Sequence, residues 1–236
     1  MNAEASRGGL VWCLGFAGLV ALGLLAAPAT VARGALITWG LDEEFSGATP
    51  PQAAVPPPWL TVTVDDGADG TDGIVTLTLA ATNLTGSEKV KEWMLNLDPA
   101  FGPANLTFTK MNATGTFNAP AISTGTNAFR AGGGVKYDIE FAFDKTGSDS
   151  NNFGAGESIV YSVELSSGGT LEAASFDFLS EPANSHGPFP TAAHVLGIGS
   201  DGDDSGWITA PEPATLSLLA LGGIGMLLSR HRRRAA

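Results

Sequence analysis

The sequence predicts an all-β protein: a single antiparallel β-sandwich of jelly-roll or immunoglobulin-like topology, with an apolar helix at each end of the chain. Three observations support this fold class. Several short segments alternate apolar residues with threonine or charged residues, which is the period of strands with one buried face. Clusters of Gly, Asp and Ser separate these segments by hairpin-length loops. Between the two ends, no stretch of ten residues has the apolar spacing of a helix.

The predicted strands follow one another through the central region of the chain. The first two alternate apolar residues with threonine, and the third places charged residues on its outward face. The last predicted strand is short and lies in a region that is otherwise rich in Gly, Ser and Asp. The bounds of the predicted strands are 59–64, 74–79, 136–143, 158–165, 175–179 and 195–198.

Composition divides the chain into four parts. Residues 1–35 have the character of a signal peptide, and 36–180 form the predicted β-sandwich domain. Residues 181–210 are rich in Gly and Asp and are predicted to be a loop and spacer. Residues 211–236 form a separate tail, and the predicted spacer would keep the folded domain at a distance from it.

The N-terminus resembles a secretory signal in the order of its parts. Arg7 supplies the positive end, and Leu10 to Ala27 form an apolar core that we expect to be helical. Small residues follow this core, and they favour cleavage between Ala29 and Ala35. The core has 18 residues, which is also long enough for an uncleaved anchor. The chain is therefore predicted to enter the secretion machinery.

Cysteine content and charge restrict the chemistry of the central domain. The single cysteine, Cys13, lies in the signal core, so the mature protein is expected to have no disulfide and no reactive thiol. Six of the 12 basic residues but only two of the 24 acidic residues lie in the terminal segments, which leaves the domain with 16 excess negative charges. Nucleic acid is excluded as a partner, because its binding needs clustered Lys and Arg.

The C-terminal tail combines three elements in a fixed order. Pro211 and Pro213 bracket Glu212 and keep the backbone extended. The uncharged stretch 214–229 follows; as a helix it would be about 24 Å long, shorter than the roughly 30 Å of hydrocarbon in a bilayer. The arginines that end the tail are Arg230, Arg232, Arg233 and Arg234. They are predicted to stay on the cytoplasmic side of the membrane.

The tail resembles the PEP-CTERM sorting signal of bacterial exported proteins. The resemblance rests on the Leu- and Gly-rich span, on the arginine cluster, and on the motif Pro211, Glu212, Pro213, Ala214 and Thr215. It implies that an exosortase, a membrane enzyme similar to a transpeptidase, recognises the tail and removes it near Pro-Glu-Pro. It also implies transient anchoring in the inner membrane and delivery to the cell surface or to a matrix rich in exopolysaccharide. A permanent C-terminal membrane anchor is the alternative.

No metal site or cofactor is predicted, and calcium is the alternative that two acidic loops leave open. The candidate calcium ligands are the four aspartates Asp65, Asp66, Asp69 and Asp72, interleaved with glycines. A second acidic group contains Asp201, Asp203 and Asp204. Neither group has the spacing of an EF-hand, and Asp and Gly are also the residues that plain turns prefer.

Histidine and tryptophan are two further residue types with the chemistry of binding groups. His186 and His194 have the chemistry of zinc ligands, but their Gly- and Pro-rich surroundings favour a loop role. A row of exposed tryptophans would be able to stack on sugar rings, and the candidates are Trp39, Trp59, Trp93 and Trp207. Their apolar neighbours favour packing in the core instead.

The sequence therefore supports three hypotheses about function. The first is a non-enzymatic exported surface or extracellular-matrix protein, such as a component of a biofilm matrix, that is processed by an exosortase. The second is a secreted carbohydrate-binding module associated with exopolysaccharide. The third is a secreted hydrolase, which would need two carboxylates that converge in a cleft.

Overall fold

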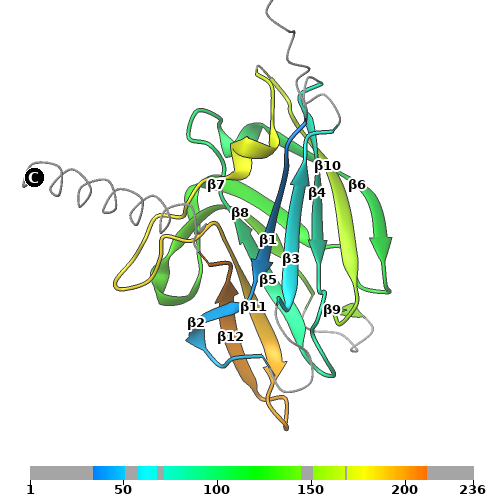
Figure 1. Ribbon diagram of the computed structural model, residues 1–236, viewed down its shortest axis with the longest axis vertical. Coiled ribbons are helices and arrows are strands. Elements are labelled where there is room, and N and C mark those ends of the chain that lie inside the picture. Colours follow the sequence, from blue (N-terminus) through cyan, green and yellow to red (C-terminus); the bar gives the residue numbers. More distant parts are fainter. Residues whose placement is uncertain (1–33, 51–57, 68–71, 145–150, 168, 212–236) are drawn as a thin grey trace, which may run out of the picture. The chain divides into compact units, whose positions relative to one another are not determined.

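The computed structural model describes residues 34–50, 58–67, 72–144, 151–167 and 169–211 (Figure 1). Over these residues the chain is all-β and forms two antiparallel sheets, which confirms the predicted fold class at that level. No helix in the described segments is long and apolar enough to cross a membrane. The predicted signal helix and transmembrane helix lie outside the described residues.

The first sheet has five strands in the order β1-β3-β4-β10-β6. Each strand pairs antiparallel with its neighbour. Buried and partly exposed residues alternate along β3, because valine and leucine point to one face and threonine to the other. The bounds are β1 (Leu36–Leu41), β3 (Leu60–Asp65), β4 (Ile74–Ala80), β6 (Leu106–Thr114) and β10 (Ser158–Leu165).

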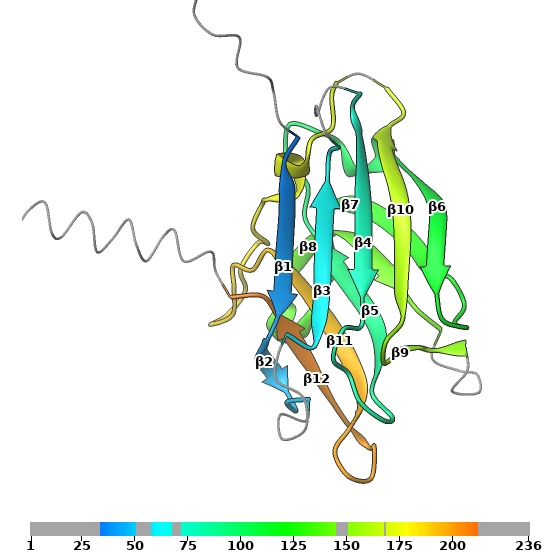
Figure 2. The same ribbon diagram turned by 45° about the vertical axis from the view of Figure 1, so that its right-hand side comes forward.

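The second sheet has seven strands, six of them in the order β2-β12-β11-β5-β8-β7, with β9 paired to β5 off this path. Figure 2 shows β11 and β12 behind the first sheet, with β5 beside β11. The bounds are β2 (Glu43–Gly47), β5 (Lys89–Leu95), β7 (Ala121–Arg130), β8 (Lys136–Ala142), β9 (Phe153–Gly154), β11 (Thr191–Ile198) and β12 (Asp204–Thr209).

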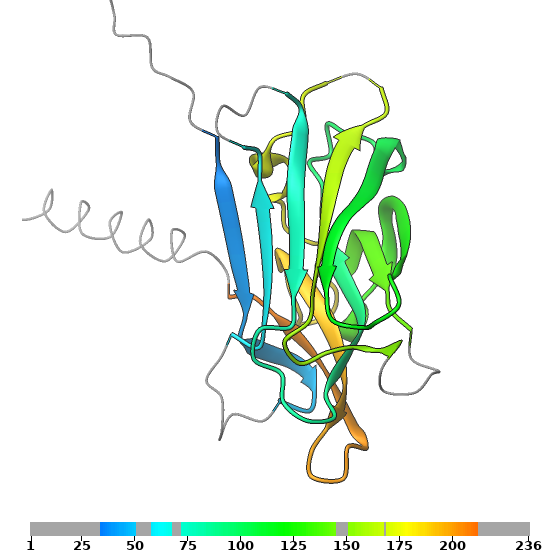
Figure 3. The ribbon, with the colours of Figure 1, turned by 90° about the vertical axis from the view of Figure 1, so that its right-hand side faces the viewer.

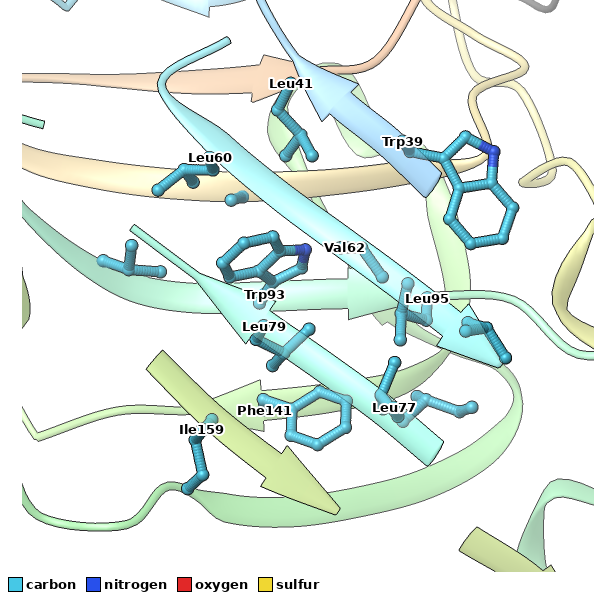
Figure 4. Close-up of a cluster of buried hydrophobic side chains, with 14 of the residues drawn as sticks. Trp39, Leu41, Leu60, Val62, Leu77, Leu79, Trp93, Leu95, Phe141 and Ile159 are labelled. Carbon is cyan, nitrogen blue, oxygen red and sulfur yellow. The ribbon is translucent and has the colours of Figure 1, made fainter. Parts of the chain in front are cut away.

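The main hydrophobic core lies between the two sheets, which face each other in the side view of Figure 3. Leu60 and Leu79 of the first sheet and Trp93 and Phe141 of the second are each no more than 1% exposed, and Figure 4 shows their side chains in one cluster. Burial of such large apolar side chains from both sheets is the main stabilising contribution.

A second, smaller apolar cluster belongs to the seven-stranded sheet and is separate from the main core. Its buried members come from β5, β8 and β11 and from the short connection before β8. They are Met94, Ala131, Val135, Tyr137 and Ala192, with Phe45, Phe129, Phe189 and Trp207 packed against them. Central strands of this sheet therefore carry apolar side chains on both faces.

Most of the predicted strands are confirmed. The segments 59–64, 74–79 and 136–143 correspond to β3, β4 and β8, and 158–165 is β10 to the residue. The prediction at 195–198 falls within the longer β11.

One predicted strand, 175–179, is wrong. A short 3-10 helix, η4 (Ala173–Phe176), occupies part of this segment. The Ser175 hydroxyl accepts a hydrogen bond from the Glu172 amide (3.1 Å), and the Ser175 amide donates to the Glu172 carbonyl oxygen (3.0 Å). This reciprocal capping starts a helical turn, and Phe176 enters the core from it.

The predicted loop and spacer over 181–210 is also at variance with the structure. Two strands of the second sheet, β11 and β12, lie in this segment, and β11 is paired on both sides, with β5 and β12. Ala193, Val195 and Ile208 from these strands are fully buried in the main core. The folded domain therefore extends to the start of the tail.

Candidate functional site

The start of the tail lies directly on the folded domain. Thr209, the last residue of β12, is fully buried, and its hydroxyl donates a hydrogen bond to the Thr191 carbonyl oxygen (2.6 Å). The Thr209 carbonyl oxygen accepts a hydrogen bond from the Asp42 amide (3.1 Å). Ala210 is 2% exposed, whereas Pro211 is exposed. The chain therefore passes from the buried core to the surface between two consecutive residues.

A hollow of about 280 Å³ surrounds this exit point. Its walls are formed by Ile37 to Gly40 of β1 and by Asp177, together with Ala210 and Pro211 themselves. The remaining predicted sorting residues lie outside the described residues; they are Glu212, Pro213, Ala214 and Thr215, and the arginines Arg230, Arg232, Arg233 and Arg234. Pro211 is thus the one motif residue whose surroundings the structure gives.

Two of the candidate calcium ligands serve the fold itself. The Asp65 carboxylate accepts a hydrogen bond from the Gly67 amide (2.9 Å). Asp66 is 4% exposed, and its two carboxylate oxygens accept hydrogen bonds from the amides of Ala35 and Ala173 (3.0 Å for the latter). A buried carboxylate with such partners ties three segments together, because each backbone amide finds an acceptor.

The other predicted acidic ligands do not form a metal centre in the described part of the chain. Asp72 is exposed, and Asp69 lies outside the described residues. Asp201, Asp203 and Asp204 are exposed in and beside the β11–β12 hairpin. Among the described residues, no three His, Cys, Asp or Glu side chains are placed to hold a metal ion.

The two histidines of the domain make different packing contacts. His186 packs over Gly133, where an added Cβ would come within 2.2 Å of the imidazole, and its ring lies 6.0 Å from that of Phe45. The His194 ring stacks on Trp207, with centroids 4.7 Å apart and planes 8° from parallel. Both histidines thus pack against aromatic side chains of the second sheet.

The prediction that the tryptophans pack in the core is confirmed for three of the four candidates. Trp39, Trp59 and Trp93 are at most 6% exposed. Trp207 is partly buried between the His194 ring and Gly132, whose position leaves no space for a Cβ against the indole. The described residues therefore present no row of exposed tryptophans.

Two glutamates on neighbouring strands of the second sheet form a carboxylate pair that the sequence did not single out. The pKa of Glu140 on β8 is raised, first by burial and then by the negative charge of Glu92 on β5, while Lys91 partly opposes the shift. Glu92 itself forms an ion pair with Lys91 (2.7 Å), and its carboxylate lies 4.0 Å from His194 Nδ1. The sequence predicted outward charged residues on the strand 136–143, which contains Glu140. It did not predict that this strand pairs with β5, which contains Glu92.

A polar pocket of about 260 Å³ lies where β9 pairs with the start of β5 (Figure 2). Three connections form its walls: the one between β4 and β5, the one between β6 and β7, and the segment 152–157. Asn152 is one of the lining residues and is 4% exposed, and its buried Nδ2 and Oδ1 atoms have no hydrogen-bond partner in the protein. No sequence pattern pointed to this residue.

The comparisons with known proteins identify the tail. Residues 209–234 match the family model of the PEP-CTERM protein-sorting motif, the C-terminal sorting signal of exosortase substrates. No curated protein and no solved structure matches the chain. The motif indicates an exported protein that is transiently anchored in the membrane before an exosortase, a membrane enzyme, processes it. The matched segment begins at Thr209, the last residue of β12.

Proposed function

We propose that the chain is a non-enzymatic structural protein of the bacterial surface or extracellular matrix, released from the membrane when an exosortase removes its tail. The observation that carries this proposal is the sorting motif at residues 209–234, which directly follows the last strand of a folded β domain. The predicted signal peptide at 1–35 supports export of the same domain.

The architecture supports a passenger role. Two antiparallel sheets share one core, so we assign the domain as a β-sandwich whose strands are fixed by packing between the sheets. The domain has no cysteine, and its acidic residues far outnumber its basic ones, which favours solubility outside the cell. The stability of such a domain comes from its core and not from a disulfide.

The junction implies close contact between the domain and the processing enzyme. An extended chain spans at most about 3.6 Å per residue, and the sorting motif begins directly after the buried Ala210 in the sequence. An enzyme that cuts near Pro211-Glu212-Pro213 must therefore approach the domain surface around Pro211. The hollow beside β1 and Asp177 belongs to that surface.

Replacement of Pro211, Glu212 and Pro213 by alanine tests the proposal. In a host with an exosortase, the wild type is expected in the exported fraction without its tail, and the variant is expected at full length in the membrane. A matched control replaces Ser166, Ser167 and Thr170 of a loop in the domain by alanine and is expected to be processed normally. If the wild type also stays in the membrane at full length, the tail is an anchor and the proposal fails.

A carbohydrate-binding module is the second candidate function. A row of tryptophans does not support it, since three of the four in the domain are buried. The observation in its favour is the polar pocket that contains Asn152. The hydrolase hypothesis has weaker support, because Glu92 is already paired with Lys91.

A further inference from the structure

We propose that the free edge of β1 pairs with the same edge of a second copy of this chain, so that the five-stranded sheets of the two copies join into one. The proposal goes beyond the proposed function, because it names a contact between copies, and it does not depend on how the tail is processed. Three features carry it: an edge without irregularities, backbone groups that are complementary to their own copy, and side chains without charge.

β1 differs from the other strands that end the two sheets. It is the first strand of the five-stranded sheet, and in the described part of the chain no strand pairs with its outer side (Figure 2). Its pairing with β3 runs without a shift from Leu36 to Leu41. The other terminal strands, β6, β2 and β7, each pair with their neighbour through a register shift. Such irregularities protect an edge against pairing with another chain, and β1 lacks this protection.

Hydrogen bonds at both ends of β1 show which of its backbone groups face outward. The Ala35 carbonyl oxygen accepts a hydrogen bond from the Asp66 amide (3.2 Å), and the Leu41 carbonyl oxygen accepts one from the Trp59 amide (3.0 Å). Asp66 and Trp59 flank β3, so the odd-numbered residues of β1 face that strand. In an antiparallel pair, the backbone groups of alternate residues point to opposite sides. The residues whose N–H and C=O groups point to the free edge are therefore Leu36, Thr38 and Gly40.

These outward groups are complementary to those of an identical strand. A two-fold axis at Thr38 places the two Thr38 residues opposite each other, and it places Leu36 opposite Gly40 of the second copy. Each outward N–H then faces a carbonyl oxygen, and each outward carbonyl oxygen faces an N–H. The contact uses the same surface on both chains, so it closes at two copies.

The side chains of β1 also suit an identical partner. Its sequence, Leu-Ile-Thr-Trp-Gly-Leu, contains no charged residue and no proline, so no like charges meet across the pair. Leu36 is 65% exposed, and in the pair it lies opposite Gly40 of the second copy. Gly40 is next to Pro58, because a Cβ added to Gly40 would lie 2.9 Å from the Pro58 Cβ. Pairing therefore brings an exposed leucine beside apolar surface.

The start of the tail is the nearest alternative partner for this edge. The hollow of about 280 Å³ at the tail exit adjoins residues 37–40 as well as Pro211. Proline has no N–H group, and both Pro and Glu are disfavoured in strands, so the sequence Pro211-Glu212-Pro213 is a poor partner. β1 contains isoleucine, threonine and tryptophan, which strands favour. A second copy is therefore the better occupant of the free edge.

Disulfide cross-linking tests the proposal in the full-length chain in detergent micelles, with Cys13→Ser to remove the native thiol. Thr38→Cys is expected to form a covalent dimer on oxidation, because residues paired at the axis have Cα atoms about 5.5 Å apart, within the disulfide range. Thr63→Cys is the matched control. Its side chain lies on the same face as that of Thr38, but three strand spacings, about 14 Å, would separate the two copies of this residue.

Two outcomes of the cross-linking overturn the proposal. The first is no more dimer with Thr38→Cys than with Thr63→Cys. The second uses a chain that combines Thr38→Cys with Ala214→Cys: if its main product is a disulfide within one chain, the tail occupies the edge in place of a second copy.

Sedimentation equilibrium in the same micelles measures the affinity. One pair of six-residue strands makes a small interface, so we expect a wild-type Kd of about 10–100 µM. Thr38→Pro removes an outward N–H and leaves the hydrogen bonds to β3 intact, and Thr38→Asp places two carboxylates opposite each other. Each is expected to weaken association by about tenfold or more. Thr63→Asp is the control and should leave the Kd unchanged.

A dimer that persists in both Thr38 variants forms through another surface and overturns the proposal, and so does a wild type without association in this range. Tail processing is expected to be normal in both variants. Failure of this contact is therefore distinguishable from failure of the proposed function.

Discussion

At the scale of single residues, a buried chain of hydrogen bonds joins β5, β11 and β12. The Trp93 indole Nε1 donates to the Thr191 hydroxyl (3.0 Å), which donates to the Met94 carbonyl oxygen (2.7 Å). The Thr209 hydroxyl donates to the Thr191 carbonyl oxygen (2.6 Å). Thr191 is therefore the connecting residue, and it is fully buried. Buried polar groups of this kind are stabilising only while each has its partner.

Replacement of Thr191 by valine is expected to destabilise the domain by about 1–3 kcal/mol, because the buried Trp93 Nε1 loses its acceptor. Thr38→Val is the control, since the Thr38 hydroxyl shares only an exposed hydrogen bond with Thr63 (3.3 Å), and its loss should cost less than about 0.5 kcal/mol. Urea unfolding measures both. Equal effects of the two substitutions would contradict the role assigned to Thr191.

Glu140 predicts a pH dependence of stability. Its folded pKa is raised by burial and by Glu92, so the folded state holds this proton more tightly than the unfolded state and loses stability as pH rises through the folded pKa. Glu140→Gln should therefore raise the Tm by about 1–3 °C at pH 7 and have no effect at pH 3.5, below the unfolded pKa. Glu164→Gln, at an exposed position of β10, is the control. A larger gain at pH 3.5 than at pH 7 would contradict this sign.

The fate of individual residues was only partly predictable. The sequence placed the tryptophans in the core, because their neighbours are apolar, and this holds for Trp39, Trp59 and Trp93. Asp66 was a candidate calcium ligand in sequence, yet in the structure it bonds to amides that are 31 and 107 positions away along the chain. Asn152 gave no signal in the sequence, because its burial comes from segments that only the fold brings around it.

At the scale of elements, strands with strong alternation were predictable and strands with small residues or glycine were not. β10 matched its prediction because its large apolar residues Ile159, Tyr161 and Val163 recur at every second position, which is the period of a strand. β11 contains Gly197, which has φ +77° at an irregularity in the pairing with β12, and a Cβ there would lie 2.2 Å from the Ser87 carbonyl oxygen. This glycine is required by close packing and lies within the short predicted strand 195–198, but the prediction missed the first half of β11 and all of β12.

The lack of a spacer after β12 predicts an effect on processing. Insertion of Gly-Ser-Gly-Ser between Ala210 and Pro211 is expected to speed tail removal by about twofold or more, because a flexible linker relieves the crowding between the domain and the enzyme. Pulse-chase labelling of the exported chain measures the rate. The same insertion between Ser166 and Ser167, in an exposed loop, is the control and should leave the rate unchanged. Unchanged or slower processing with the first insertion would mean that the domain does not obstruct the enzyme.

At the scale of the whole molecule, the most informative property of the sequence was the fixed order of the three parts of the tail. The motif, the apolar span and the arginines identified the tail without any fold, and the family match at 209–234 agrees. All-β character followed from periodicity, but the sheet order did not, because pairings such as β5 with β11 join residues about a hundred positions apart. The function of the domain depends on such pairings, so sequence alone left it open.

The most direct measurement of the central claim is the intact mass of the exported wild-type protein. Processing at both ends predicts a single chain that begins between Ala29 and Ala35 and ends near Pro211-Glu212-Pro213, without residues 214–236. The C-terminus would then lie within a few residues of the last core residue, Ala210. An exported protein whose mass includes the chain through Ala236 would contradict the claim that the tail is a sorting signal removed by the processing enzyme.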